Sequence, residues 1–466
     1  MSDAVDVAVI GAGPAGMAAA AELAERGVGV RVYDEQASPG GQVFRSIEKV
    51  TEQRPADLHT LGEQYARGLR DVRRFRQSAV SYVPGAAVWE LDGSSPQEVR
   101  LGLLHDNRAA TVRARHALIA TGAMERPTPF PGWTLPGVMS TGAAQTLLKE
   151  SGLVPEGRVV LAGSGPLLYL FASQMLQSGC VPVCILDTTT RMSLTALAVL
   201  APAAVHALPE LRRGMRWLQR IRDSSIEHIH RVTGLQAIGG ERLQTIRFRQ
   251  RRRWLEVSAD LLLVHDGVIP NTWLAMSAGC EHYWHTRQQC WHPRIQANGV
   301  SSHERISIAG DAGGIVGGDL ACIRARLAAL HVAHSLGAAT RVEVQEAQNA
   351  AHSGTRKLVA LRHFLDGYYV PAAAFQLPED DDTLVCRCEE ITVAQIKAVA
   401  ALGCTGPNQG KAFTRCGMGP CMGRECGITV SRLLDNHHKL GMQETGYFRI
   451  RPPVKPITVG QLADLE

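Results

Sequence analysis

The chain opens with a pattern of apolar and small residues that predicts a strand, a helix and a second strand. Residues 5–10, "VDVAVI", form an apolar run of strand length, and residues 15–27, "AGMAAAAELAERG", have the composition of a helix. The run "VGVRVYD" then ends at Asp34. The glycine-rich turn "GAGPAG" joins the first strand to the helix. Together these segments predict a complete βαβ unit.

A second unit with the same pattern lies further along the chain. The segment "GRVVLAGSGPLLYLFASQMLQSG" joins an apolar strand to a helix through Gly163 and Gly165, and "VPVCILD" ends at Asp187. Leu168 stands where a third motif glycine is expected. Its side chain would hold the helix away from the strand and crowd a pyrophosphate. Two interpretations stay open, a working NAD(P) site and a domain retained for its shape.

The first turn has the residues that dinucleotide binding requires. The first glycine permits the tight turn, the second lets backbone approach a pyrophosphate, and the third lets the helix pack on the strand. A carboxylate at the end of the second strand can accept both ribose hydroxyls; Asp34 is the candidate and Glu35 the neighbouring alternative. The predicted contacts in this unit are Gly11, Gly13, Ala15, Gly16, Asp34 and Glu35.

Three later segments indicate which dinucleotide binds. The loop "ASPGGQVFR" follows the acid, "ALIATGAMERP" holds an ATG turn after an apolar strand, and "ERISIAGDAGG" places Gly-Asp after another strand. In this order they resemble the disulfide-reductase-like flavoproteins, which implies bound FAD. The further predicted FAD contacts are Gly41, Gln42, Arg45, Thr121, Gly122, Gly310 and Asp311. No CxxC pair occurs in the chain, which excludes the dithiol mechanism of thioredoxin reductase.

Composition and charge fit a globular protein of several domains. The chain has 466 residues, of which 45% are hydrophobic, and a formal net charge of +5. The densest basic run, "RFRQRRRW", has too few aromatics for nucleic-acid stacking and is expected to be a solvated hairpin edge. No signal peptide or spanning helix is visible, so we expect a cytoplasmic protein, with attachment at the membrane through its electron acceptor as the alternative.

Six of the eleven cysteines fall between Cys386 and Cys426. A CxC pair, Cys386 and Cys388, is followed by the glycine-rich loop "TRCGMGPCMGREC", which can wrap closely around a bulky group. Four thiolates in this arrangement suit a [2Fe–2S] cluster better than zinc, which usually takes two CxxC knuckles. The loop offers three thiols, so five cysteines compete for four places and spacing alone does not choose among them.

The same segment resembles the C-terminal domain of the α subunit of hetero-oligomeric amine dehydrogenases. That family includes octopine and nopaline oxidases, D-hydroxyproline dehydrogenase, dye-linked proline dehydrogenases and hydrogen cyanide synthase. The blocks "DEQASPGGQVFR", "PFPGWTLPGV" and "AGSGPLL" extend the resemblance over most of the chain. The family pattern, "CRCE" and then "TR-x-GMGPC-x-GR-x-C", implies that Cys416 is not a ligand, and Met422 stands where the family usually has Gln. The implied ligands are Cys386, Cys388, Cys421 and Cys426.

The resemblance implies an α/β fold of the two-dinucleotide-binding, disulfide-reductase-like type with a small C-terminal ferredoxin-like [2Fe–2S] domain. The expected divisions are 1–125 and 265–340 for the FAD domain, 126–264 for the NAD(P)-like domain, 341–382 for a linker, 383–440 for the cluster domain and 441–466 for a tail. The resemblance also implies a partner, a D-amino-acid-oxidase-like flavoprotein β subunit that oxidises the substrate. Some members of the family have a small γ subunit as well. The α subunit then passes electrons on to an acceptor.

The residues themselves indicate no substrate pocket. Arg126 and Arg324 could bind a carboxylate, but lone arginines are more often structural. His228 and His230 form an HxH pair with no obvious third ligand, so the spacing is interpreted as incidental. Two alternatives to the α-subunit hypothesis remain: a stand-alone NAD(P)H-dependent oxidoreductase with the cluster domain as its outlet, and a redox-inert scaffold.

Overall fold

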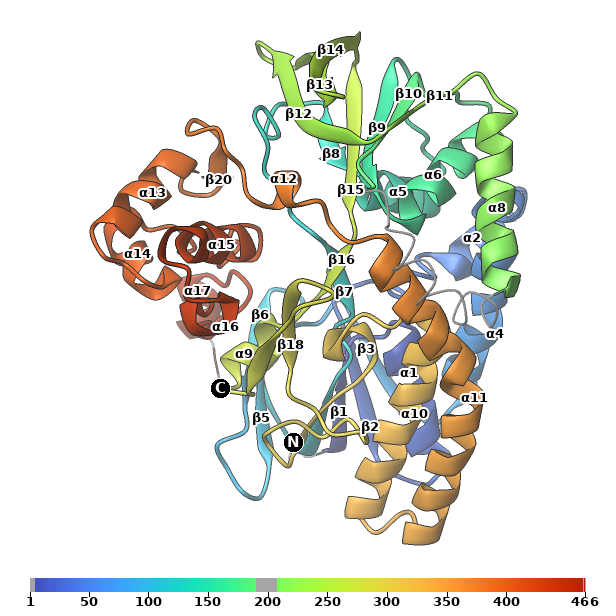
Figure 1. Cartoon of the computed structure of the whole chain (residues 1–466). Coiled ribbons are helices and arrows are strands. Elements are labelled where there is room, and N and C mark those ends of the chain that lie inside the picture. The colour runs from blue at the N-terminus through green and yellow to red at the C-terminus, as the bar shows by residue number, and fades with distance from the viewer. Residues whose placement is uncertain (1–4, 190–207, 464, 466) are drawn as a thin grey trace.

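The computed structural model describes residues 5–189, 208–463 and 465 (Figure 1). It contains the first predicted βαβ unit as β1 (Val5–Ile10), α1 (Pro14–Ala24) and β2 (Val30–Asp34). The two strands are parallel, with Val9 opposite Val32. Five alanines of α1 are buried, and such small side chains let the helix lie close to the sheet. The predicted unit is therefore confirmed.

This unit belongs to a seven-stranded sheet with the order β3-β2-β1-β6-β5-β4, in which β19 also pairs with β6. The added strands are β3 (Ser81–Pro84), β4 (Ala87–Asp92), β5 (Val99–His105), β6 (Arg108–Ile119) and β19 (Ile306–Ile308). Strands β1, β2, β3, β6 and β19 run parallel, whereas β4 to β6 form an antiparallel meander. Residues far apart in the sequence thus end at the same edge of one sheet.

Helices cover this sheet and fix the ends of its strands. Helix α10 (Gly318–Ser335) packs against α1 and follows η1 (Gly310–Gly313) directly after β19. Helices α2 (Ile47–Gln53), α3 (Asp57–Leu61) and α4 (Glu63–Gln77) follow β2, and α4 also packs on α1. The apolar core between α1, α4, α10 and the sheet is continuous with that of the second unit.

The second unit forms a five-stranded parallel sheet with the order β11-β10-β9-β15-β8. Its elements are β8 (Val138–Ser140), α5 (Thr141–Ser151), β9 (Val159–Ser164), α6 (Pro166–Gln177), β10 (Cys184–Asp187), α8 (Leu208–Arg222), β11 (Glu227–His230) and β15 (Leu261–Asp266). A three-stranded meander, β12 (Val232–Gly239), β13 (Leu243–Gln250) and β14 (Arg253–Ser258), leads into β15. The basic run forms the β13–β14 hairpin, as predicted, with its turn at Arg251 and Arg252.

Two short antiparallel strands join the two units. They are β7 (Ala123–Glu125) and β16 (Val268–Pro270), and they carry the chain out of the first unit and back into it. Helix α9 (Trp273–Ser277) and the hairpin of β17 (His282–His285) and β18 (Cys290–Pro293) follow β16. These connections place the glycine turns of both units near the same crossing.

The segment expected as a linker, 341–382, is helical over most of its length. Helix α11 (Arg341–Tyr368) packs against α10 and is followed by the short α12 (Ala373–Gln376). A capping box starts α11, since the Thr340 side chain accepts from Glu343 N–H and the Glu343 carboxylate accepts from Thr340 N–H. Glu343 also pairs with Arg26 at 2.9 Å. The helix was not predicted because its apolar positions are sparse, whereas the cap residues were present in the sequence.

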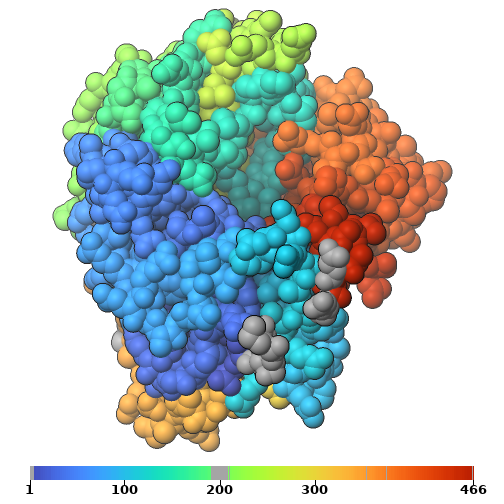
Figure 2. Space-filling view, turned by 180° about the vertical axis from the view of Figure 1, so that it is seen from behind, coloured from blue at the N-terminus to red at the C-terminus, as the bar shows by residue number. Residues whose placement is uncertain are grey.

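The C-terminal domain begins with β20 (Leu384–Cys386) and β21 (Ile391–Thr392). Its helices are α13 (Val393–Ala401), α14 (Pro407–Thr414), α15 (Gly427–His438), α16 (Met442–Thr445) and α17 (Val459–Ala463). The prediction of a helix capped near Thr392 is confirmed, because α13 has Thr392 at its N-cap within a capping box. Viewed from behind, the surface is hollowed where this domain meets the two others (Figure 2). No helix of the described residues is long and apolar enough to span a membrane.

Candidate cofactor sites

The first glycine turn packs backbone against backbone. A Cβ on Gly16 would lie 1.8 Å from the carbonyl oxygen of Gly11, and Gly11 has a φ of 101°. Neither position accommodates a side chain, so the start of α1 is held directly against the end of β1. Gly13 differs, because the nearest atom to a Cβ there is the Cα of Gly41 at 3.9 Å. The space in front of Gly13 is therefore open to a ligand.

Asp34 is the acid that faces this turn. Its Oδ2 accepts a hydrogen bond from Ala12 N–H, and its Oδ1 accepts from Gln36 N–H at 2.7 Å. Burial raises the pKa of the Asp34 carboxyl, and the two backbone donors partly oppose that rise. The neighbouring Glu35 instead pairs with Lys455 at 2.7 Å. Of the two candidate acids, the geometry favours Asp34 for a ligand at the glycine turn.

The late Gly-Asp segment reaches the same place. A Cβ on Gly310 would lie 2.6 Å from the Cβ of Ala15, so η1 abuts the first turn of α1. Asp311 Oδ1 accepts hydrogen bonds from Val316 N–H at 2.8 Å and Gly317 N–H at 3.0 Å. The carboxylate is thus held just before the start of α10, where backbone N–H groups favour negative charge.

The ATG segment closes the other side of the turn. A Cβ on Gly11 would lie 2.6 Å from the carbonyl oxygen of Ala120, the residue just before Thr121. Thr121 Oγ1 donates to the carbonyl of Asn271 at 3.1 Å. The structure therefore brings together around the N-terminus of α1 segments that are about 300 residues apart in the chain.

The loop "ASPGGQVFR", which carries Gly41, is anchored by charged side chains that are buried or partly buried. Arg45 pairs with Glu150 of α5 at 2.7 Å, and Tyr65 of α4 donates its hydroxyl to the Arg45 carbonyl at 2.6 Å. Lys149 Nζ donates to the carbonyl of Gln42 at 2.8 Å, and burial lowers the pKa of Lys149 to about 8. These contacts hold the loop of Gly41 beside the first glycine turn.

The second glycine turn is filled by side chains of its own chain. A Cβ on Gly165 would lie 3.1 Å from the imidazole of His265, and Gly165 has a φ of 118°. His265 Nδ1 is held at 2.7 Å from Glu125 Oε1. Leu168 is fully buried in the core beneath α6. His265 thus lies against Gly165, whereas only Gly41 lies near Gly13.

The HxH pair has a third partner. Asp187, at the end of β10, lies with His228 and His230 in a group whose candidate ligand atoms are all within 4.8 Å of one another. The structure thus supplies the third candidate ligand that the sequence did not reveal. The sequence held a clue, since Asp187 ends one strand of a parallel sheet and the histidines end a later strand that pairs with it.

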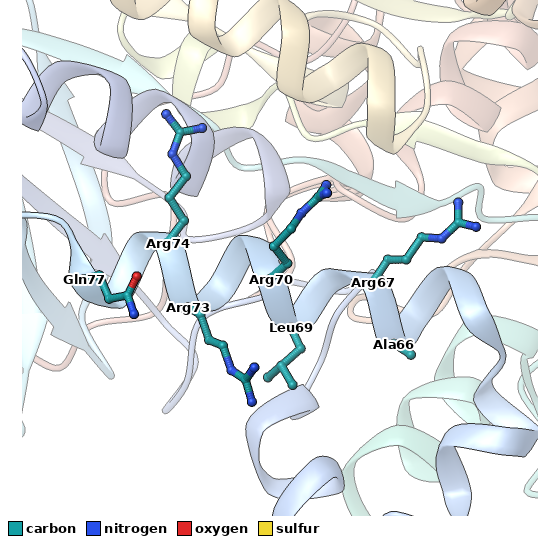
Figure 3. A pocket seen from close by; sticks show the side chains of 7 residues that line it. All are labelled: Ala66, Arg67, Leu69, Arg70, Arg73, Arg74 and Gln77. Carbon is teal, nitrogen blue, oxygen red and sulfur yellow. The ribbon is translucent and has the colours of Figure 1, made fainter.

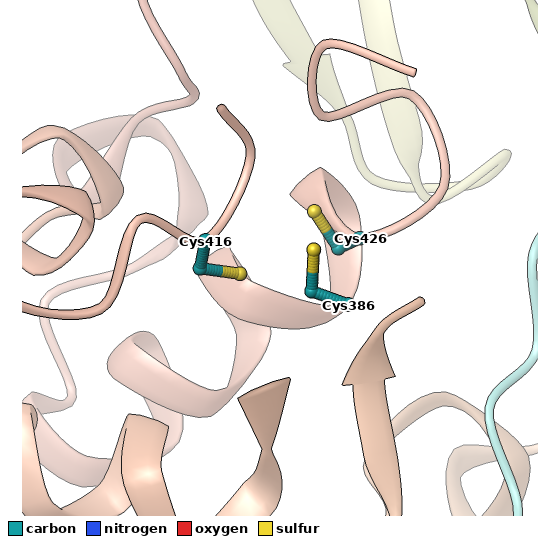
Figure 4. Close-up of side chains that lie close together, drawn as sticks. All are labelled: Cys386, Cys416 and Cys426. Carbon is teal, nitrogen blue, oxygen red and sulfur yellow. The ribbon is translucent and has the colours of Figure 1, made fainter. Parts of the chain in front are cut away.

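Three buried cysteines meet in the C-terminal domain. The sulfurs of Cys386, Cys416 and Cys426 lie within 4.8 Å of one another (Figure 4). Cys386 ends β20, Cys426 caps α15, and Cys416 follows α14, so three different elements supply them. Hydrogen bonds from Cys416 and Cys426 lower the pKa of the Cys386 thiol. The three sulfurs therefore lie close enough together to share one metal centre.

The other two cysteines of the motif lie together beside this group. Cys388 is hydrogen-bonded to Cys421, and its charge interacts with that of Cys386. A Cβ on Gly419 would lie 2.2 Å from the Cβ of Cys388, which explains why the loop carries glycine there. All five thiols thus gather in one place. The structure adds Cys416 to the group without selecting four ligands from the five.

Aromatic residues pack this cysteine loop onto the first domain. Tyr447 is partly buried, donates its hydroxyl to the carbonyl of Gly423 at 3.1 Å, and makes edge contacts with Trp273 and Trp291. The core of the first sheet continues without a break into the C-terminal domain. Trp133 Nε1 also donates to the carbonyl of Leu384 at 2.7 Å. The cysteine group is thus held against the domain that carries the first glycine turn.

Of the two arginines considered for a substrate, Arg126 is committed to backbone carbonyls. The Arg126 guanidinium donates to the backbone carbonyls of Asp266, Gln288 and Gln289 at 2.7–3.2 Å, so it ties β7 to its neighbours. Arg324 lies on α10 with an exposed side chain, and its charge interacts with that of Asp311. A hollow of about 490 Å³ on α4 is lined by Arg67, Arg70, Arg73 and Arg74 (Figure 3). It holds no group suited to oxidation chemistry.

Two family models match the chain over its two parts. The model of the pyridine nucleotide-disulphide oxidoreductase family matches residues 5–354, and the model of the sarcosine oxidase A3 domain matches residues 381–465. An L-proline dehydrogenase from P. horikoshii has a similar structure, with a TM-score of 0.71 and 18% identity over 98% of this chain and 79% of that one. A T. acidophilum thioredoxin reductase covers 72% of this chain with a TM-score of 0.53 and 18% identity, and 99% of that chain is aligned.

Curated relatives match from end to end. An opine oxidase subunit from Rhizobium meliloti is 38% identical over 99% of this chain and 87% of its own length. The hydrogen cyanide synthase subunit HcnB of Pseudomonas aeruginosa is 33% identical over 98% of both chains. Both relatives are named as subunits of larger enzymes.

Proposed function

The chain belongs to the family of opine oxidase and hydrogen cyanide synthase subunits, which are FAD-dependent oxidoreductase subunits, and on that premise we propose that it transfers electrons within a multi-subunit secondary-amine dehydrogenase. In this proposal a separate β flavoprotein oxidises an amino acid or opine. This chain receives the electrons through FAD and passes them on through a [2Fe–2S] cluster. The observation that carries the proposal is the packing of five thiols against the domain with the open glycine turn.

The residues at the first turn fit FAD. The open space before Gly13 admits a pyrophosphate, and the N–H groups at the start of α1 face it. We assign Asp34 to the ribose and Asp311 to the ribityl chain of FAD, since both carboxylates lie at the N-terminal end of α1 or directly after the strand beside it. The proposed FAD contacts are Gly11, Gly13, Ala15, Gly16, Asp34, Gly41, Gln42, Arg45, Thr121, Gly122, Gly310 and Asp311, with Glu35 kept as the less favoured acid.

The thiol-only donor set fits an iron–sulfur cluster. We propose Cys386, Cys388, Cys421 and Cys426 as ligands, following the family pattern. Cys416 lies close enough to compete, so the choice needs an experiment. FAD can accept an electron pair and release single electrons, and the cluster carries one electron at a time. The chain's own part is to hold both groups in place and to bury three of the five thiols, those of Cys386, Cys416 and Cys426.

Serine replacement tests the ligand set, because an alcohol is a much poorer iron ligand than a thiolate. Cys421→Ser and Cys426→Ser should each lose or strongly alter the visible absorption and the paramagnetic signal of the reduced protein. Cys416→Ser should keep both. Cys404→Ser is the matched control, since Cys404 is a buried cysteine of the same domain outside the five-thiol group. The opposite ranking would move the ligand to Cys416, and unchanged spectra in all variants would remove the cluster.

Substrate oxidation is assigned to the partner. Arg126 is committed to three backbone carbonyls, and the interior of the second unit is filled by His265 and Leu168. We therefore expect no amine oxidation by this chain alone. The test is dye reduction by the purified chain, with and without a co-expressed D-amino-acid-oxidase-like β subunit, using opines and cyclic amino acids as substrates. Robust substrate-dependent reduction by the single chain would overturn the proposal.

The alternative function is a stand-alone NAD(P)H-dependent oxidoreductase. The second βαβ unit and the family model for residues 5–354 favour it. The closed turn at Gly165 opposes it. Flavin bleaching by NADH, without any partner, would favour this alternative over the α-subunit proposal.

A further inference from the structure

We propose that Asp187, His228 and His230 form a binding site for one divalent transition-metal ion, separate from the cysteine group. The three residues come from the ends of neighbouring strands in the second unit. Strands β10 and β11 are parallel, with Asp187 directly opposite His230 and Ile185 opposite His228. Residues two apart in a strand project to the same face of the sheet, and so do directly paired residues of parallel strands. Both imidazoles and the Asp187 side chain therefore lie on one face, at the end of β10.

The spacing of the ligand atoms matches a tetrahedral ion. Asp187 Oδ2 lies 3.0 Å from His230 Nδ1 and 3.5 Å from His228 Nε2. Metal–ligand bonds of about 2.0–2.1 Å at tetrahedral angles place neighbouring ligand atoms about 3.3 Å apart. The imidazole rings are 3.9 Å apart between centroids, and all three ligand atoms lie within 4.8 Å of one another. Small rotations of exposed His230 suffice to complete the geometry.

The buried members of the group are prepared for an ion. His228 Nε2 is buried and has no hydrogen-bond partner among the described residues, although the Asp187 carboxylate is near. Such an atom costs free energy unless something binds it. Asp187 Oδ1 accepts from Thr189 N–H at 2.8 Å, which orients the carboxylate and leaves Oδ2 facing the histidines. An outer hydrogen bond of this kind is a usual support of a metal ligand.

The donor set defines the class of ion. Two imidazole nitrogens and one carboxylate oxygen suit zinc, cobalt, nickel or ferrous iron, whereas magnesium and calcium take mainly oxygen ligands. His230 is 60% exposed, so the site opens to solvent and leaves a position for water or an outside ligand. A bound ion would also occupy the carboxylate that, in the first unit, is placed for a ribose. The proposal does not depend on the electron-transfer function.

Zinc uptake by the complete, iron-loaded protein tests the site. Wild-type protein is dialysed against buffers of fixed free zinc, and zinc and iron are counted per chain. His230→Gln and His228→Gln should each weaken the binding of one zinc ion by about 100-fold, with iron unchanged. His437→Gln, from the adjacent histidine pair that ends α15, is the control and should bind zinc as the wild type does.

The result is decisive whether or not zinc also binds at the cysteines. Because His230 is largely exposed, His230→Gln should keep the flavin content and the circular dichroism of the wild type, so failed folding does not explain a loss of zinc. Cobalt bound at the proposed site should give visible bands without the intense absorption of thiolate ligands. Equal zinc uptake by wild type and His230→Gln, or no uptake beyond that at the cysteines, would overturn the proposal.

Discussion

The two βαβ units share a sequence pattern and differ in what lies in front of their glycines. At Gly13 the nearest neighbour is another glycine, Gly41, and the space is open. At Gly165 the imidazole of His265 is in contact, and Leu168 replaces the third glycine. The spacing of glycines therefore selects the fold in both units. The residues supplied by other strands determine what lies against each turn.

The acids at the ends of the second strands differ in the same way. Asp34 accepts hydrogen bonds from two backbone N–H groups, Ala12 and Gln36, which orient it toward the glycine turn. Asp187 is instead enclosed by two imidazoles from β11. An acid at this position therefore takes its contacts from the neighbouring strand as well as from its own turn.

The largest expected effect is on flavin content. Gly13→Val places a branched side chain in the space before the first turn, where only Gly41 lies near, so the chain should fold but lose nearly all of its FAD. The ratio of flavin to protein absorbance measures this. Gly214→Val is the control, because a Cβ at Gly214 meets nothing within 4 Å and its φ is not positive. Full flavin in Gly13→Val would show that the FAD site is misassigned.

A second change tests the packing that replaces the third glycine. Leu168 is fully buried, so Leu168→Ala removes apolar contacts and leaves a cavity, and should lower the free energy of unfolding by about 3 kcal/mol. Urea unfolding followed by circular dichroism measures it. Flavin content should stay at the wild-type level, since the cavity lies in the other unit. A loss below about 1 kcal/mol would mean that Leu168 is not part of the second unit's core.

An effect of similar size, which appears only when the pH changes, is expected from a buried acid beside the second turn. Burial raises the pKa of Asp266 from 3.8 to about 6, while Arg126 opposes the rise. The folded state therefore binds a proton more tightly than the unfolded state. The contribution of Asp266 to the free energy of unfolding is fully present below pH 4. It falls by about 3 kcal/mol as the pH rises through 6.

The variant Asp266→Asn isolates that contribution. Asn carries no charge, so its unfolding free energy should fall less than that of the wild type between pH 4 and pH 7.5. Urea unfolding at both pH values gives the difference. An equal fall in the unfolding free energy of both proteins would mean that ionising Asp266 does not destabilise the folded state.

Much of the architecture could be predicted because it depends on local patterns. The strand, turn and helix of the first unit, the hairpin around Arg251 and the cap at Thr392 all follow from residues within a few positions of one another. Helix α11 was missed because it has few apolar residues and depends on packing against α10. Local sequence predicts an element well only where the element's own pattern specifies it.

The sites were predictable to the extent that a motif carries them in one segment. The first glycine turn needs only neighbouring residues, whereas the contact of His265 with Gly165 joins residues 100 apart in the chain. The contact of Asp187 with the HxH pair and that of Cys416 with Cys386 also join residues far apart in the sequence, so the motifs alone did not reveal them. Strand order determines the first two contacts, and the packing of the loop after α14 against β20 determines the third.

One measurement tests the central contrast most directly. The purified chain, with its flavin oxidised and oxygen excluded, is mixed with excess NADH or NADPH while the flavin absorbance is followed. If the second turn admits no pyridine nucleotide, the absorbance should persist with both nucleotides and disappear with dithionite, and the β subunit with its substrate should also bleach it. Rapid, stoichiometric bleaching by either nucleotide would contradict the account.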